Sequence, residues 1–167
     1  YDKESLENIE NITDGQGVKY MLMCPSNDSF YYEVTGHSYE MNAEIIIPED
    51  INGIPVKTVE DNVFSGCTSL TAITLPNSLT SIGVRTFKNC SNLVSVIFGD
   101  QLATIEKYAF DGCSSLSSVV IPNSVTYIGE FAFYQCSGLT SVTLGNGLTN
   151  LKGGTFYGCS GITTIKI

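Results

Sequence analysis

Apolar residues return at a fixed interval along most of the chain, which has 167 residues. From about residue 44 onward, each unit of 23 residues carries a phenylalanine, then a cysteine, then a run with alternating aliphatic residues. The phenylalanines are Phe64, Phe87, Phe110, Phe133 and Phe156, and the cysteines are Cys67, Cys90, Cys113, Cys136 and Cys159. A fixed period of this length is typical of a solenoid in which each coil packs on the next one.

One unit can be divided into three parts by its pattern. In LTSVTL (139–144) the aliphatic residues alternate with Ser and Thr, which predicts a strand with one buried face. A Pro or Gly turn ends this strand, and a second arc such as VTYIG (125–129) returns on the opposite side. The remaining segment, EFAFYQC (130–136), is long enough for only about one turn of helix. We therefore predict an α/β solenoid that is rich in β-structure, with a parallel sheet and short helical turns.

The front of the chain lacks this period and has the pattern of a hairpin. Two alternating runs, VKYMLMC (18–24) and FYYEVT (30–35), flank the turn-forming segment PSND. An antiparallel hairpin here would cover the core of the first coil and protect its open sheet edge.

The predicted organisation has three parts. Residues 1–17 form a flexible lead, residues 18–43 the hairpin cap, and residues 44–167 a leucine-rich-repeat solenoid of about five coils. The chain ends at Ile167 on an inward strand position. We interpret this ending as a truncated array or as a terminal coil covered by a neighbouring molecule.

The repeat resembles a known family. The segment AFDGCSSLSSVVIPNSVTYIGEFAFYQCSGLTSVTL is similar to the BspA-type leucine-rich repeat, and the resemblance extends over residues 44–167. Gly99 and Gly145 replace the proline of the pattern, and Gly154–Thr155 breaks its Ala-Phe pair in the last coil. The resemblance implies a secreted or cell-surface protein, mostly of host-associated anaerobic bacteria, and often one associated with adhesion.

Charge and composition exclude several classes of partner. The formal net charge is −9, and it comes from the first 61 residues, where acidic residues greatly outnumber lysines. No basic stripe is present to bind a nucleic-acid backbone, and no apolar run is long enough for membrane insertion. Because the chain starts at Tyr1 rather than Met, we expect that a signal peptide has been removed.

The five cysteines of the repeat are predicted to be a row of buried free thiols. Cysteine is among the residues most often buried, and a translated row of identical side chains does not supply the torsions of a disulfide. Cys24 lies outside the row, and we expect another buried thiol there. A zinc site is disfavoured because no Cys-x-x-Cys pair occurs.

The sequence gives little support for catalysis, and no cofactor is predicted. His37 is the only histidine, so any Cys–His or Ser–His nucleophile would have to use it, and we predict a surface or loop residue there. The acidic pairs Glu49–Asp50 and Glu60–Asp61 leave calcium open as an alternative.

Two surfaces are candidate binding sites. Aromatic residues near the predicted helical turns form one of them, namely Tyr108, Tyr127, Phe131, Tyr134 and Tyr157. Ile97 and Val120 form an apolar centre on the outward face of the sheet. Clustered aromatic side chains are good anchors for protein or sugar contacts, although some of them could simply cover the flank of the core.

These observations favour a non-enzymatic binding module of a secreted or surface protein, which contacts a host or bacterial protein or a glycan. The alternative is a stiff spacer, or a stalk that associates with itself end to end. A third hypothesis, an accessory domain of an enzyme, depends only on flanking regions outside this sequence.

Overall fold

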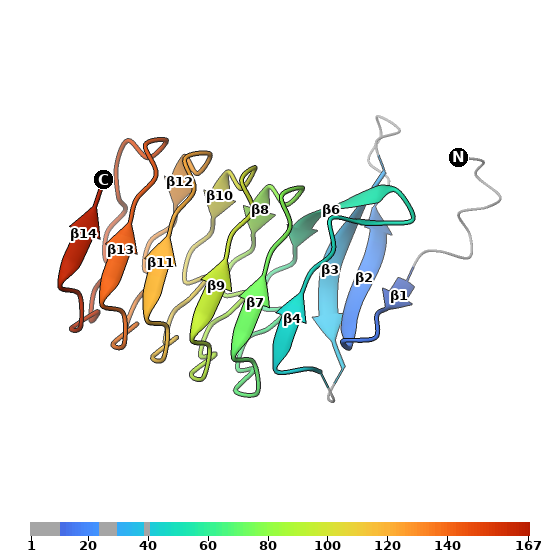
Figure 1. The fold of residues 1–167 in the computed structure, drawn as a ribbon, viewed down its shortest axis with the longest axis horizontal. Helices are drawn as coiled ribbons and strands as arrows, with labels where there is room; N and C mark the ends of the chain where they lie inside the picture. The colour runs from blue at the N-terminus through green and yellow to red at the C-terminus, as the bar shows by residue number, and fades with distance from the viewer. Residues whose placement is uncertain (1–10, 24–29, 39–40) are drawn as a thin grey trace.

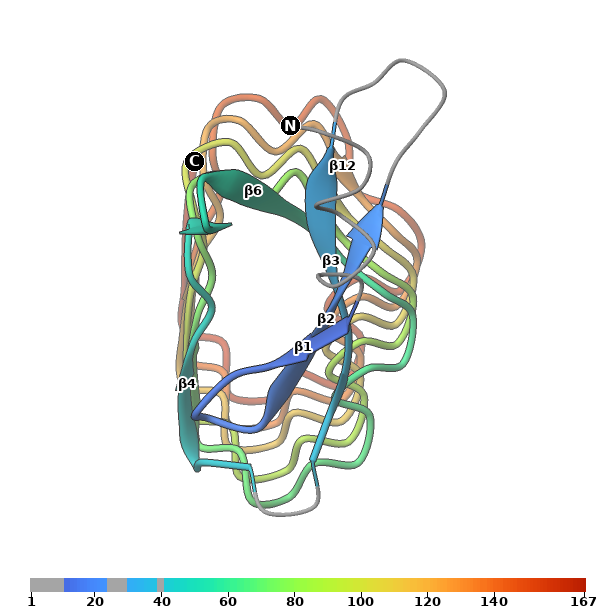
Figure 2. The same cartoon turned by 90° about the vertical axis from the view of Figure 1, so that its right-hand side faces the viewer.

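The computed structural model describes residues 11–23, 30–38 and 41–167. These residues form an elongated β-solenoid whose coils are stacked side by side along its long axis (Figure 1). Seen along that axis, the coils superpose as a flattened tube (Figure 2). The strands are β1 (Asn11–Thr13), β2 (Val18–Met23), β3 (Tyr31–His37), β4 (Glu44–Ile46), β5 (Asp50–Ile51), β6 (Ile54–Val59), β7 (Ala72–Thr74), β8 (Ser81–Ile82), β9 (Ser95–Ile97), β10 (Thr104–Ile105), β11 (Ser118–Val120), β12 (Tyr127–Ile128), β13 (Ser141–Thr143) and β14 (Thr164–Lys166).

One wall of the tube consists of parallel strands at the predicted positions. Strands β4, β7 and β9 form one sheet, and β11, β13 and β14 form another. The register follows the repeat, so that Val119 pairs with Val142 and Val142 pairs with Ile165. The described residues thus contribute six strands to this wall, where the sequence predicted about five coils.

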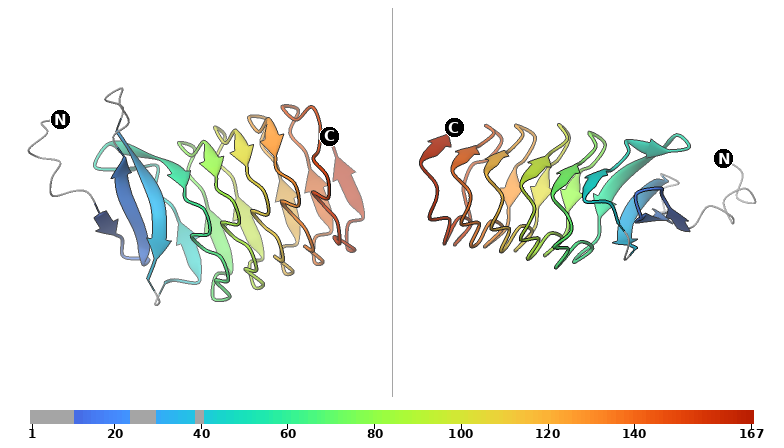
Figure 3. Two further views of the ribbon diagram at one scale, coloured as in Figure 1. Left: turned by 180° about the vertical axis from the view of Figure 1, so that it is seen from behind. Right: turned by 60° about the horizontal axis from the view of Figure 1, so that its bottom comes forward.

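The opposite wall is formed by the second arc of each coil. Strands β6, β8, β10 and β12 pair in parallel, with Ile82, Ile105 and Ile128 in register. Strand β5 turns back on β6 through Asn52 and Gly53, which both have positive φ, as a tight two-residue hairpin requires. The two walls are visible from behind and from below in Figure 3.

A continuous stack of phenylalanine rings fills the tube on the side of the connecting turns. The rings of Phe64, Phe87, Phe110, Phe133 and Phe156 lie face to face, with neighbouring centroids 5.3, 5.0, 5.1 and 5.4 Å apart. Burial of each such ring contributes about 1.5–3 kcal/mol. Because every ring needs a ring above and below it, stability comes from stacking the coils rather than from any one coil.

The predicted helical turns are not confirmed, because the described part of the chain contains no helix. The segment between the two walls is instead a series of tight turns. Each coil places two residues there at positive φ, four positions apart, for example Arg85 and Asn89, which interrupts a right-handed helix. The N–H groups of Phe87 and Phe110 donate to carbonyls of the following coil, Ala109 and Ala132, and not to the preceding helical turn. The described part of the chain is therefore a β-solenoid, and the α/β prediction is not confirmed.

The N-terminal hairpin is present, and it continues one wall of the tube. Strands β2 and β3 pair antiparallel, and β3 then pairs in parallel with β6. Tyr20 and Tyr32 are buried beneath it. The side-chain amide of Gln16 donates to the carbonyl of Ile46 and accepts from its N–H, both at 2.8 Å, which satisfies the free edge of β4.

Part of the segment predicted as a flexible lead is a strand. Strand β1 pairs antiparallel with β2, and the carboxylate of Asp14 accepts hydrogen bonds from the N–H of Gln16, the N–H of Val18 and the hydroxyl of Tyr20. This network fixes the turn between β1 and β2, within the segment that the sequence analysis predicted to be flexible. The rest of the predicted lead, residues 1–10, and Cys24 lie outside the described residues.

Candidate functional site

The residues predicted to form a binding surface lie in three places. Four of the aromatic residues form one continuous row along the turns, which we call the aromatic ladder: Tyr108, Phe131, Tyr134 and Tyr157. Tyr127 is separate on β12, where the ammonium group of Lys152 lies 5.8 Å from its ring centroid. Ile97 and Val120 lie on the other wall, on β9 and β11.

The aromatic ladder runs along the solenoid axis across three coils. Tyr108 and Phe131 stack with their centroids 5.2 Å apart, Phe131 meets Tyr134 edge-on at 5.6 Å, and Tyr134 stacks on Tyr157 at 5.6 Å. Tyr108, Phe131 and Tyr134 are half-buried, whereas Tyr157 at the end of the row is 67% exposed. The ladder is therefore partly accessible to solvent, and its rings are held in place by their contacts with one another.

Local backbone geometry fixes the two inner rings of the ladder. Tyr108 and Phe131 occupy the first positive-φ position of their coils, with φ of 58° and 57°. The next residue in this row is Gly154, and the Phe131 ring fills the space that a Cβ at Gly154 would need. Glycine at residue 154, where the earlier coils carry Arg85, Tyr108 and Phe131, thus makes room for the ring.

Positive charge is concentrated at the Tyr108 end of the ladder. The charged groups of Arg85, Lys88 and Lys107 lie 5.3, 5.4 and 5.3 Å from the centroid of the Tyr108 ring. Such distances permit cation–π attraction. This end of the ladder is thus basic and aromatic, and the Tyr157 end is aromatic and exposed.

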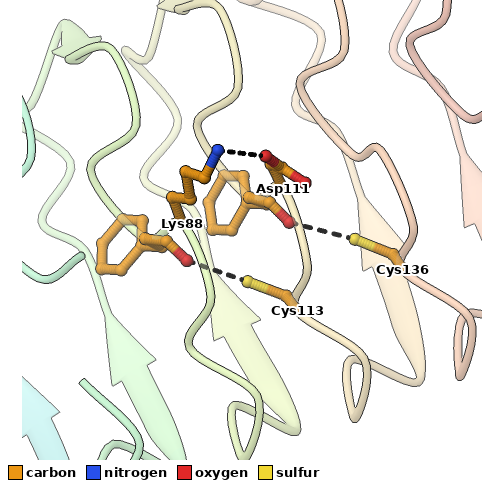
Figure 4. A network of polar contacts seen from close by, with 6 residues as sticks. Lys88, Asp111, Cys113 and Cys136 are labelled. Carbon is orange, nitrogen blue, oxygen red and sulfur yellow. Dashed lines mark hydrogen bonds and ion pairs between the residues drawn. The ribbon is translucent and has the colours of Figure 1, made fainter. Parts of the chain in front are cut away.

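Two of these lysines also form ion pairs, which differ in burial. Lys88 contacts Asp111 at 2.9 Å, and the Asp111 side chain is nearly buried (Figure 4). Lys107 contacts Glu130 at 3.2 Å, and both side chains are about half exposed. The carboxylate of the first pair is thus largely shielded from solvent, whereas both charges of the second pair remain on the surface.

The wall that carries Ile97 and Val120 is interrupted between them. Among the described strands, β9 and β11 belong to different sheets although they follow each other along the stack. Ile97 is 59% exposed and Val120 is 64% exposed, and both line a cavity of about 420 Å³. Phe98 also lines it, at the core position where other coils carry Leu or Ile, and packs edge-on against Phe110. The structure therefore brings Ile97 and Val120 together, but on a wall that does not carry the aromatic ladder.

The five described cysteines are free and buried, as predicted. Four of their thiols donate to the backbone carbonyl of the phenylalanine in the preceding coil, as Figure 4 shows for Cys113 and Cys136. The four bonds join Cys90 to Phe64, Cys113 to Phe87, Cys136 to Phe110 and Cys159 to Phe133, with Sγ···O distances of 3.0, 3.1, 3.2 and 3.0 Å. Burial raises the pKa of the Cys90 thiol to about 12.

Cys67 has a different partner, which the sequence analysis missed. Its Sγ lies 3.0 Å from Nε2 of His37. His37 is the last residue of β3, so its predicted placement in a loop was wrong. Its half-buried ring stacks on Phe64 with the centroids 5.8 Å apart. At the start of the solenoid, the imidazole thereby extends the stack of phenylalanine rings and also takes the place of the carbonyl that accepts from the thiol in later coils. The sequence could have indicated a different partner, because Cys67 is the first cysteine of its row and no phenylalanine one coil earlier supplies a carbonyl to its thiol.

The acidic pairs that left calcium open form backbone contacts instead. The Glu49 carboxylate accepts from the N–H groups of Asn77 and Ser78, and Asp61 accepts from the N–H of Val84. The hydrogen bonds from Asn77 and Ser78 lower the pKa of the Glu49 carboxyl group. In the described ranges, no three His, Cys, Asp or Glu side chains are grouped so that they could hold a metal ion.

The same ranges contain no helix that is long and apolar enough to cross a membrane.

Comparison with protein families gives one match, to the BspA-type leucine-rich repeat region, with six copies over residues 57–167. The chain therefore belongs to the BspA-type leucine-rich repeat family. No curated protein matches the chain.

Several crystal structures are similar to this chain, and three of them are compared with it. A leucine-rich repeat protein of T. pallidum is 30% identical with a TM-score of 0.70, and the match covers 92% of this chain and 81% of that one. A leucine-rich cell surface protein of Faecalibacterium prausnitzii is 25% identical (TM-score 0.81; 94% and 39% covered), and a leucine-rich repeat protein of Bacteroides ovatus is 26% identical (TM-score 0.67; 93% and 46% covered). The chain thus spans less than half of the last two proteins. No enzyme family is indicated by these matches.

Proposed function

We propose that this BspA-type leucine-rich repeat chain is a binding module of a secreted or cell-surface protein, and that it recognises a protein or glycan through the aromatic ladder. The observation that carries the proposal is the row of four rings that contact one another and end in the exposed Tyr157. The cell-surface location of the related F. prausnitzii protein supports the proposed location.

The arrangement of the rings suits recognition for an energetic reason. Binding by a flexible side chain loses conformational entropy, whereas Tyr134 and Phe131 are already held by their ring contacts. Exposed tyrosines combine a large apolar surface with a hydroxyl group, so they can stack on a sugar ring or anchor a protein side chain. The neighbouring Arg85 and Lys107 would favour a partner that carries negative charge near its contact with Tyr108.

The experiment is a binding screen of the chain against extracellular-matrix proteins, plasma proteins and a glycan array. The Tyr134→Ala/Tyr157→Ala double variant is screened beside it, and Ile97→Thr/Val120→Thr serves as the control on the wall without the ladder. A saturable interaction lost in the tyrosine variant and kept in the control supports the proposal. An interaction lost only in the control moves the site to the interrupted wall, and no interaction in any variant contradicts a binding function of this chain.

A second function, that of a stiff spacer, is favoured by the unbroken stack of phenylalanine rings. Such a stack makes each coil depend on its neighbours and resists bending between coils. Light scattering after size-exclusion chromatography distinguishes a spacer that associates with itself from an isolated module. Assembly that grows with protein concentration favours the spacer, and a monomer at all concentrations opposes end-to-end association.

A further inference from the structure

We propose that Cys67 and His37 form a reactive thiol site, at which Cys67 forms a mixed disulfide with small polar disulfides. This inference is independent of the proposed binding function. It concerns a modification of the chain itself, and it depends on the geometry at the start of the solenoid.

The hydrogen bonds of His37 determine which ring nitrogen carries the proton. Nδ1 lies 3.0 Å from the backbone carbonyl of Ser38, which can only accept, so Nδ1–H is the donor. Nε2 is then unprotonated and accepts from the Cys67 thiol at 3.0 Å. A thiol beside a base that is itself oriented by a third group is the arrangement required for an activated nucleophile.

A cavity of about 410 Å³ opens beside this pair. Cys67 and His37 both line it, together with Met41. The other described residues of the lining are Ser38, Ser65, Gly66, Thr68 and Ser69, and among these hydroxyl and backbone groups predominate. This lining fits a small polar molecule better than an apolar one.

The proposed reaction needs no oxidant other than the disulfide itself. The Cys67 proton passes to Nε2 of His37, and the thiolate attacks one sulfur of the disulfide R–S–S–R. The bond between Cys67 Sγ and that sulfur forms as the S–S bond of the reagent breaks. The departing R–S⁻ takes the proton from His37 and leaves as R–SH, so the imidazole returns to its starting form.

The other cysteines provide an internal comparison. Cys159 is 9% exposed and Cys67 is 8% exposed, but Cys159 donates to the carbonyl of Phe133, which cannot take up a proton. Exposure alone therefore predicts equal reactivity of these two thiols. Burial raises the pKa of Cys67 to about 11, so a reaction without help from His37 would be slow at neutral pH.

The experiment treats the folded chain with hydroxyethyl disulfide and measures the modification of each cysteine by peptide mass mapping. Cys67 is expected to react about 10-fold faster than Cys159 or more, as general-base assistance allows.

Two variants test the role of His37. His37→Phe keeps a ring on Phe64 and removes Nε2, so the Cys67 rate should fall to that of Cys159. If this variant does not fold, His37→Asn serves instead, because its amide oxygen can accept the thiol proton in a hydrogen bond but cannot take it up. Equal rates for Cys67 and Cys159 in the unmodified chain would overturn the proposal. An unchanged Cys67 rate in a folded His37 variant would overturn it as well.

Discussion

The ring of Phe131 lies over the backbone of Gly154, in the space that a side chain at residue 154 would otherwise fill. The two residues occupy the same position in consecutive coils and share a positive φ, 57° at Phe131 and 69° at Gly154. This contact decides where Phe131 points, and it therefore decides whether Tyr108 and Tyr134 belong to one ladder or to two separate pairs.

We expect Gly154→Ala to destabilise the chain by about 1–3 kcal/mol, because the new Cβ meets the Phe131 ring at a strained backbone position. The same backbone conformation is occupied by Arg85 and Tyr108, so displacement of the ring should dominate the loss. Gly153→Ala is the matched control, since a Cβ there meets no atom within 4 Å. Urea denaturation of both variants checks the prediction, and equal losses would contradict it.

The two lysine ion pairs should differ in their contribution to stability. Lys88→Gln leaves the nearly buried carboxylate of Asp111 without its cation, and we expect a loss of about 2 kcal/mol. Lys107→Gln breaks the exposed pair with Glu130 and should cost less than about 1 kcal/mol. Both lysines lie near the Tyr108 ring, so the loss of cation–π attraction is matched between them. Thermal denaturation of both variants at low and high salt measures the difference.

The phenylalanine stack should be most sensitive in its middle. Phe110→Ala removes a fully buried ring that contacts Phe87, Phe133 and Phe98, and we expect a loss of about 3–5 kcal/mol. Phe156 is only partly buried and stacks on Phe133, so Phe156→Ala should cost clearly less. Denaturant titration of both variants gives the two values, and a larger loss at Phe156 would show that the stack is not the main source of cooperativity.

Glu49 should make the stability of the first coils depend on pH. The N–H groups of Asn77 and Ser78 bind its charged form, so its pKa is lower in the folded chain than its ordinary value of 4.5. The resulting stabilisation is present above the unfolded pKa and is lost as the pH falls through the folded one. Glu49→Gln should therefore be less stable than the unmodified chain at pH 7, and the difference should shrink as the pH is lowered towards 2.

The control for this effect is Glu44→Gln, at an exposed position on β4. Denaturation curves of both variants over the same pH range test the assignment. An equal pH dependence of the two differences would contradict a specific role of Glu49.

The regular part of the fold was predictable because one short pattern is repeated. Every coil buries the same positions, so the spacing of Phe110, Cys113 and Val119 already indicates which residues face inward. The hairpin was predictable from its two alternating runs. The conformation of the turn segments was not predictable, because these segments are short and alternate N–H groups find acceptors in the next coil, which a pattern within one coil cannot show.

The sequence by itself determined the repeat, the inward rows and the membership of Tyr108, Phe131, Tyr134 and Tyr157 in one region of the surface. Only the tertiary structure decided that these rings contact one another, that Tyr127 lies apart from them, and that His37 reaches Cys67. The reason is physical. A period fixes which residues lie in the same row, but contacts between rows, and contacts between the cap and the first coil, depend on how the backbone turns and on where a missing side chain leaves room for another.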